Sequence, residues 1–150
     1  MFNLHFPEFD FKVKTEDEKQ LIFDKLRKKY VVITPEEWVR QHIVHYLTEV
    51  KNYPESFISV EHSIVINNIA KRCDIVVFNK SFQPKLIIEC KRPEINLTQN
   101  VFDQAGRYNL TLRVPYVAIT NGVENIVAHI DLQNGKYNFI DAYPKYKQLE

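Results

Sequence analysis

The sequence has almost no excess charge, few cysteines and no long apolar run. Its 20 Lys and Arg residues against 19 Asp and Glu residues give a formal net charge of +1, so overall charge does not indicate a nucleic-acid partner. Cys73 and Cys90 lack the paired Cys/His spacing of a zinc site, and we expect both to be reduced thiols. The sequence shows neither a signal-peptide pattern nor an apolar run near the ~20 residues of a membrane span. These absences predict a soluble cytoplasmic protein that does not contact a membrane.

Internal repeats, low-complexity tracts and linkers are also missing. With 45% hydrophobic and 13% aromatic residues, the 150-residue chain is suited to a packed core rather than to disorder. We therefore expect one domain, divided into an N-terminal extension (1–33), a core (34–122) and a C-terminal hairpin with a tail (123–150). Any basic surface has to be local, and 25–29 and 71–72 are the candidates.

The clearest helix start is Thr34-Pro35-Glu36-Glu37, where a capping side chain precedes proline and two acids. By contrast, 9–14 alternates like a strand and 21–32 mixes helix and strand signals. The remaining pattern predicts strands at 58–66, 73–78, 85–91 and 116–120, a helix at 96–112, a hairpin of 125–132 with 136–142, and a frayed tail at 145–150.

This order of elements predicts an α/β fold. The strand–helix–strand step from Leu86 to Thr120 requires a right-handed crossover and a parallel strand pair, whereas the earlier strands can pair as hairpins. We expect an α+β mixed sheet between helices, in which residues at strand ends readily form a site.

One group of polar residues sits at the ends of two of these strands. Successive side chains of a strand point to opposite faces, so Glu89 and Lys91 share a face and Cys90 points away. If the two strands pair through the turn at 81–84, Asp74 lies beside Glu89. Two carboxylates and an ammonium suit a divalent metal and a phosphodiester. The alternative is a surface ion pair between Glu89 and Lys91, which is worth only ~0–1 kcal/mol.

These residues resemble a known pattern. Asp74 followed by Glu89-x-Lys91 resembles the PD-(D/E)xK nuclease motif, and Gln104-Ala-Gly-Arg-Tyr108 resembles the Gln-x-x-x-Tyr motif of the RecB-like branch. The stretch from Pro35 to Gly122, including Arg72-x-Asp74, resembles the N-terminal nuclease domain of type I restriction enzyme R subunits. Arg72-x-Asp74 has Cys73 where many members have proline. Together these motifs, in this order, imply a restriction-endonuclease-like core.

The resemblance implies a Mg²⁺-dependent DNA endonuclease, with Mn²⁺ as a possible substitute. Asp74 and Glu89 would be the metal ligands, with the backbone carbonyl of Cys90 as a third, and Lys91 would orient the attacking water. Because 150 residues leave no room for a helicase motor, we expect no nucleotide cofactor. The remaining candidates are Gln104 as a catalytic residue, Arg72, Arg92 and Tyr108 as DNA contacts, and Glu37 as an additional acid.

Two other functional classes stay open. A catalytically silent nucleic-acid-binding module on the same fold would bind DNA without cutting it. A protein-interaction domain would use aromatic anchors in the N-terminal extension, namely Phe2, Phe6, Phe9 and Phe11. Cleavage of both strands by so small a nuclease would need two sites, which favours a homodimer.

Overall fold

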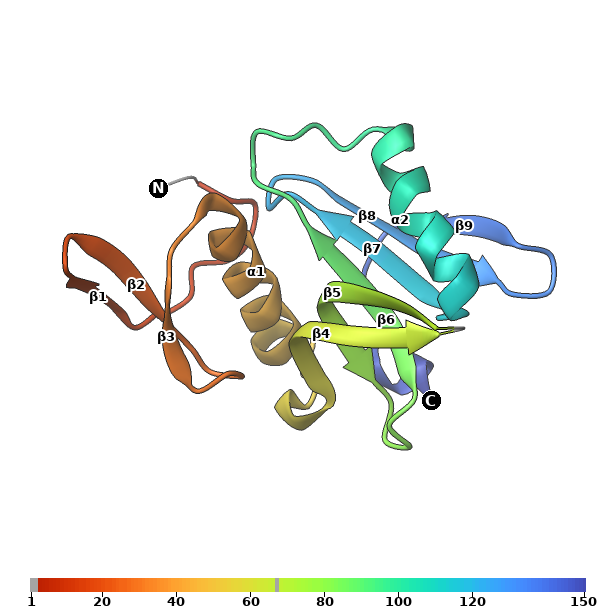
Figure 1. Ribbon diagram of the computed structural model, residues 1–150, viewed down its shortest axis with the longest axis horizontal. Coiled ribbons are helices and arrows are strands. Elements are labelled where there is room, and N and C mark those ends of the chain that lie inside the picture. Colours follow the sequence, from red (N-terminus) through yellow and green to blue (C-terminus); the bar gives the residue numbers. More distant parts are fainter. Residues whose placement is uncertain (1–2, 67) are drawn as a thin grey trace.

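The computed structural model describes residues 3–66 and 68–150, with only the backbone described for Ile66, Tyr108, Leu110 and Thr111. It contains a three-stranded sheet and a six-stranded sheet. Figure 1 shows helix α1 (Pro35–His45) between the two sheets and helix α2 (Gln99–Leu112) across the larger one. Within the described residues, no helix is long and apolar enough to cross a membrane.

The six-stranded sheet confirms the predicted mixed α/β fold. Its strands lie in chain order, and all neighbours are antiparallel except β6 and β7, which are parallel, as the crossover through α2 requires. The strands are β4 (Ile58–Ile66), β5 (Ile69–Phe78), β6 (Pro84–Cys90), β7 (Tyr116–Thr120), β8 (Asn125–Asp131) and β9 (Lys136–Ile140).

Helices α1 and α2 cover opposite faces of this sheet. The hydroxyl of Thr34 accepts a hydrogen bond from the backbone N–H of Glu37 at 3.0 Å, which caps α1 as predicted. A π-helical turn, η1 (Tyr46–Val50), extends α1. In β7, Ala118 packs in the core below α1, whereas Val117 and Ile119 pack against α2, so the strand is buried on both faces.

The N-terminal extension forms a sheet that the sequence did not resolve. Its antiparallel strands are β1 (Val13–Glu16), β2 (Lys19–Asp24) and β3 (Lys29–Val32). The turn between β1 and β2 has both Asp17 and Glu18 at positive φ, the geometry of a two-residue hairpin. Because glycine or asparagine usually marks such a turn, the acidic pair gave no hairpin signal.

The C-terminal tail differs from the prediction of a frayed end. Residues Tyr146–Leu149 form a short 3₁₀ helix, η3, between exposed flanking residues. Leu149 is 1% exposed in the core below α1, and the hydroxyl of Tyr146 donates a hydrogen bond to the carbonyl of Phe78 at 2.8 Å. Burial of Leu149 therefore holds the end of the chain against the sheet.

Candidate functional site

Asp74 lies where the regular pairing of β4 with β5 is interrupted. The pairs Val60↔Ile75 and His62↔Cys73 flank this point, and Glu61 opposite has a φ of +51°. A non-glycine residue in this left-handed region inside a strand is unusual and is typical of functional sites. The interruption leaves the Asp74 carboxylate free to turn toward β6.

The carboxylate of Asp74 is fixed to the end of β6. Its Oδ2 atom accepts a hydrogen bond from the backbone N–H of Cys90 at 2.7 Å. That N–H belongs to the peptide that joins Glu89 to Cys90, so the two acids lie side by side. Beyond them, Nζ of Lys91 is 3.5 Å from Oε1 of Glu89, and both side chains are about one-third exposed at 35% and 30%. The structure thus brings Asp74, Glu89 and Lys91 together, as the sequence pattern predicts.

The site opens on the side of the sheet that α2 covers. A depression there is lined by Asp74 and Glu89 together with Arg72 from β5, Ala105 from α2 and Val117 from β7. The two thiols are both buried and free, and burial raises the pKa of each, Cys73 and Cys90, which makes them poor metal ligands here. A metal would therefore use oxygen atoms.

The two acids in the first turn of α1, Glu36 and Glu37, have different surroundings. Glu37 is 5% exposed, and its carboxylate oxygens are held by Arg27 at 2.8 Å, Arg40 at 3.2 Å and Gln41 at 3.1 Å. Burial and the nearby charge of Asp74 raise the pKa of Glu36, and Glu89 adds to this effect. Glu36 is thus an exposed acid whose pKa responds to the charges of Asp74 and Glu89, whereas Glu37 is buried and engaged by Arg27, Arg40 and Gln41.

The other residues that the sequence predicts for the site are exposed at its margin or lie outside the described side chains. Arg72 is 67% exposed and pairs with Glu61 at 2.8 Å, and Arg92 is 62% exposed and lies 3.7 Å from Glu94. Gln104 lies exposed on α2, next to Ala105, which lines the depression. The side chain of Tyr108 lies outside the described part of the structure.

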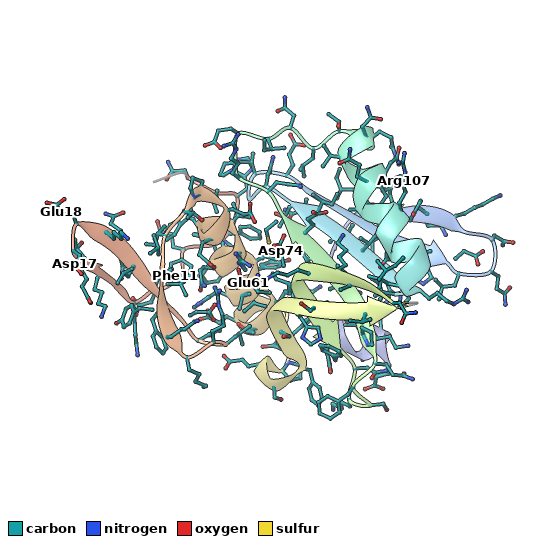
Figure 2. The ribbon with its side chains drawn as sticks, in the orientation of Figure 1. Phe11, Asp17, Glu18, Glu61, Asp74 and Arg107 are labelled. Atoms are coloured by element: carbon teal, nitrogen blue, oxygen red, sulfur yellow. The ribbon has the colours of Figure 1, made fainter. Side chains whose placement is uncertain are left out.

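Two charged residues of the site gave no signal in the sequence. Arg40 is only 6% exposed, and its Nη1 lies 3.8 Å from Oδ1 of Asp74 and 3.5 Å from Oε1 of Glu61. This buried Nη1 donor has no hydrogen-bond acceptor in the part of the chain that the structure describes. Figure 2 shows Glu61 and Asp74 near each other between α1 and the large sheet. Arg40 on α1, Glu61 on β4 and Asp74 on β5 come from separate elements of the chain, so neither spacing nor periodicity could predict that they meet.

The electrostatics of Asp74 reflect these surroundings. Burial raises the pKa of the Asp74 carboxyl, while the hydrogen bond from Cys90 and the positive charge of Arg40 oppose that shift. The charge of Glu89 reinforces the rise and Lys91 counteracts it. A positive charge added beside Asp74 would therefore favour the ionised form of its carboxyl group.

The donor set fits a hard divalent cation. Among the described residues, no three His, Cys, Asp or Glu side chains lie close enough to enclose a metal by themselves. Mg²⁺ does not need such a cage, since it retains several waters and is often bound by one or two carboxylates plus substrate phosphate. Asp74 and Glu89 would supply those carboxylates to such an ion, and the carbonyl of Cys90 directly follows Glu89 on β6.

The aromatic residues of the N-terminal segment contact the chain's own helix. The ring of Phe11 lies 5.3 Å from that of Trp38 and 4.8 Å from that of His42, and Phe9 lies 5.6 Å from His45. Phe6 is 5.5 Å from Tyr46 on the same side, and Phe2 lies outside the described residues. These rings are half-buried against α1, which leaves less of them to anchor a partner.

Comparison with known proteins relates this geometry to a family. Residues 35–144 match the family described as the type I restriction enzyme R protein N terminus. The chain belongs to this family. The match begins at the first residue of α1 and includes the whole six-stranded sheet, but it leaves out β1, β2 and β3.

A solved structure supports the same relationship at the level of fold. A fragment of a putative HsdR subunit of a type I restriction enzyme from Vibrio vulnificus YJ016 is similar with a TM-score of 0.54 and 18% sequence identity. The similarity covers 78% of this chain and 24% of that one, so the chain spans about a quarter of the length of that solved fragment. No curated protein matches the sequence. Membership of the R protein N-terminus family and its fold are thus established by sequence and by structure.

Proposed function

We propose that this R protein N-terminus relative is a Mg²⁺-dependent endonuclease of the PD-(D/E)xK type that hydrolyses DNA phosphodiester bonds. The observation that carries the proposal is the hydrogen bond from the Cys90 N–H to Asp74, which sets that carboxylate beside Glu89 with Lys91 at the same strand end. Family membership supports the proposal. We propose in addition that the protein is cytoplasmic and that it forms a homodimer to cleave both DNA strands.

Each residue has a defined task in this proposal. Asp74 and Glu89 would hold the cation, which when bound would supply an activated water and charge neutralisation at the phosphate. Lys91 orients the attacking water and counters the negative charge that develops on the phosphate oxygens. Gln104, exposed on α2 beside Ala105, would help to position the nucleophile or the adjacent phosphate, and Arg72 and Arg92 would contact phosphates from the exposed rim.

A second candidate is a DNA-binding module without catalytic activity. It is favoured by Arg40, whose buried guanidinium lies 3.8 Å from Asp74 and supplies the acid with a positive partner from within the protein. In this case DNA binding would depend on Arg72 and Arg92 but not on the carboxylates.

One experiment separates the two functions. Mg²⁺ and then Mn²⁺ are titrated calorimetrically into wild type, Lys91→Ala and Lys80→Ala, and the same samples are incubated with single-stranded, duplex and branched DNA. Lys80 is an exposed lysine beyond the far end of β5, so its variant is the control. We expect all three proteins to bind metal and only Lys91→Ala to lose cleavage, by at least about 100-fold.

The opposite results are equally informative. Absence of cleavage by wild type, together with salt-dependent DNA binding that Asp74→Ala and Glu89→Ala leave unchanged, would establish the silent module. Absence of both metal binding and DNA binding would reject both proposals.

A further inference from the structure

The N-terminal sheet, which lies outside the family match, contributes a side chain to the charged residues around Asp74. Arg27, in the loop between β2 and β3, makes ion pairs with Asp24 at 2.6 Å, Glu37 at 2.8 Å and Glu61 at 3.3 Å. It thereby joins three elements, because Glu37 lies on α1 and Glu61 on β4. Arg27 itself is only 17% exposed.

Arg40 continues this network to the site. Its Nε lies 3.2 Å from Glu37, and its Nη1 lies between Glu61 and Asp74 at 3.5 and 3.8 Å. Arg27 and Arg40 therefore share two acidic partners, Glu37 and Glu61. If Arg27 lost its charge, Arg40 would have to neutralise more of the negative charge of Glu37 and Glu61.

The loop that carries Arg27 is held in one conformation. Asp24 is 2% exposed, and its Oδ1 accepts hydrogen bonds from the backbone N–H groups of Leu26 and Arg27 at 2.8 and 3.0 Å. Its Oδ2 accepts another from Gln41 on α1 at 3.2 Å. The backbone N–H of Lys28 bonds to the carbonyl of Asp24 at 2.8 Å, and Lys28 has a φ of +58°. Such a turn fixes the direction of the Arg27 side chain.

We propose that Arg27 is a positioning residue that acts on Asp74 through Arg40, so that the N-terminal sheet is part of the working site. When Arg27 is present, it neutralises Glu37 and Glu61 and leaves Nη1 of Arg40 directed at Asp74. When it is lost, Arg40 is drawn to the two glutamates and away from Asp74. The coupling of Arg27 to Asp74 stands independently of catalysis, whereas its effect on metal binding rests on the proposed nuclease function.

Loss of Arg27 is expected to increase the affinity of the site for a divalent cation. Loss of one positive charge and withdrawal of a second from Asp74 favour a divalent ion there, since like charges repel over these distances. Arg27→Met therefore binds Mn²⁺ more tightly than wild type, by about threefold to tenfold. Arg27→Lys retains the charge and restores most of the wild-type affinity. A residue that only stabilises the fold would leave Mn²⁺ affinity unchanged or weaken it.

Lys25 provides a matched control from the same loop. Its Nζ donates a hydrogen bond to Oγ1 of Thr48 at 2.6 Å and makes an ion pair with Oε1 of Glu55 at 3.2 Å, so Lys25 also ties the N-terminal sheet to the rest of the chain. Neither contact involves Glu37 or Glu61. Lys25→Met therefore tests anchoring of the sheet without disturbing the network at Asp74.

The deciding experiment is a double-mutant cycle on the full chain in EDTA. Thermal unfolding is measured for Arg27→Met, Asp74→Asn and their combination, and for Lys25→Met with Asp74→Asn. Residues in one ion network couple, so we expect the Arg27 cycle to be non-additive by about 2–4 °C in Tm and the Lys25 cycle to be additive. Mn²⁺ calorimetry on the single variants follows.

The outcomes distinguish this proposal from the function on which it partly rests. Additive shifts in the Arg27 cycle would overturn the coupling, whatever the protein does to DNA. A non-additive cycle with no Mn²⁺ binding by wild type would keep the coupling and reject the nuclease. A non-additive cycle in which Arg27→Met weakens Mn²⁺ binding would overturn the positioning role.

Discussion

The backbone N–H of Cys90 donates a hydrogen bond of 2.7 Å to Oδ2 of Asp74, and this bond joins the two halves of the candidate site. One strand supplies the acceptor and the next supplies the donor from the peptide that follows Glu89. The relative position of the two acids is therefore set by backbone geometry and not by flexible side chains alone. In the free protein the charge of Glu89 adds to the effect of burial and raises the pKa of Asp74.

Asp74→Asn should raise the thermal stability of the metal-free protein at neutral pH. Burial, reinforced by Glu89, raises the folded-state pKa of Asp74, so ionisation of this group costs folding free energy. The cost is absent below the unfolded-state pKa of about 4, grows as pH rises toward the folded-state pKa, and is constant above it. We expect a higher Tm than wild type at pH 7 and equal values near pH 3. A lower Tm for the variant at pH 7 would contradict this assignment.

Asp24→Asn should destabilise the protein at neutral pH by about 2 kcal/mol, because hydrogen bonds to a charged group are replaced by weaker ones. Although burial opposes ionisation, hydrogen bonds from Arg27 and Leu26 lower the pKa of Asp24. The stabilisation is therefore present above the unfolded-state pKa of about 4 and is lost as pH falls through the lower folded-state value. Urea unfolding at pH 7 and below pH 3 measures both limits.

Asp17→Asn is the control for this prediction. Asp17 is exposed at the tip of the β1–β2 hairpin, at a positive φ that asparagine tolerates. Figure 2 shows Asp17 and Glu18 at the far end of that hairpin, away from Asp74. Its replacement should change the unfolding free energy by less than about 0.5 kcal/mol. An equal loss in both variants would show that the Asp24 network adds nothing specific.

Leu149→Ala should cost about 2–4 kcal/mol of unfolding free energy, even though it is the second residue from the C-terminus. The side chain is 1% exposed and lies in the same core cluster as Ile43 and Ile88. Lys147→Ala, in the same short helix but exposed, should be nearly neutral. Chemical denaturation of both variants tests whether the tail is packed or frayed, and equal midpoints would indicate a frayed tail.

The sequence predicted the central part of this fold because its signals are local. Thr34 and Pro35 mark a helix start, and β7 has the residues predicted for it, Tyr116–Thr120. The spacing of Asp74 and Glu89 could be recognised since a hairpin with a short turn brings them together. The parallel pairing of β6 with β7 followed from the strand–helix–strand connection through α2.

The parts that could not be predicted depend on long-range contacts or on unusual turn residues. The N-terminal sheet turns at Asp17 and Glu18 without glycine, so its pattern gave no hairpin signal. Glu37 is proposed as the additional acid from the family resemblance, and its ion pair with Arg27, from a segment outside the helix, is a contact that no local pattern indicates. Burial of Leu149 likewise depends on packing with core residues from distant parts of the chain, such as Ile43 and Ile88, which no local pattern indicates.

The hairpin origin of the acid pair has a consequence for the order of assembly. The hydrogen bond from Cys90 to Asp74 spans 16 positions along the chain, whereas the ion pair of Arg27 with Glu61 spans 34 (61 − 27). Shorter loops close with a smaller loss of chain entropy, so contacts between near neighbours form sooner than remote ones. We expect the paired acids to meet early during folding, while the arginine network that balances them is completed only when the N-terminal sheet docks. For that interval Glu37 and Glu61 lack the charge of Arg27.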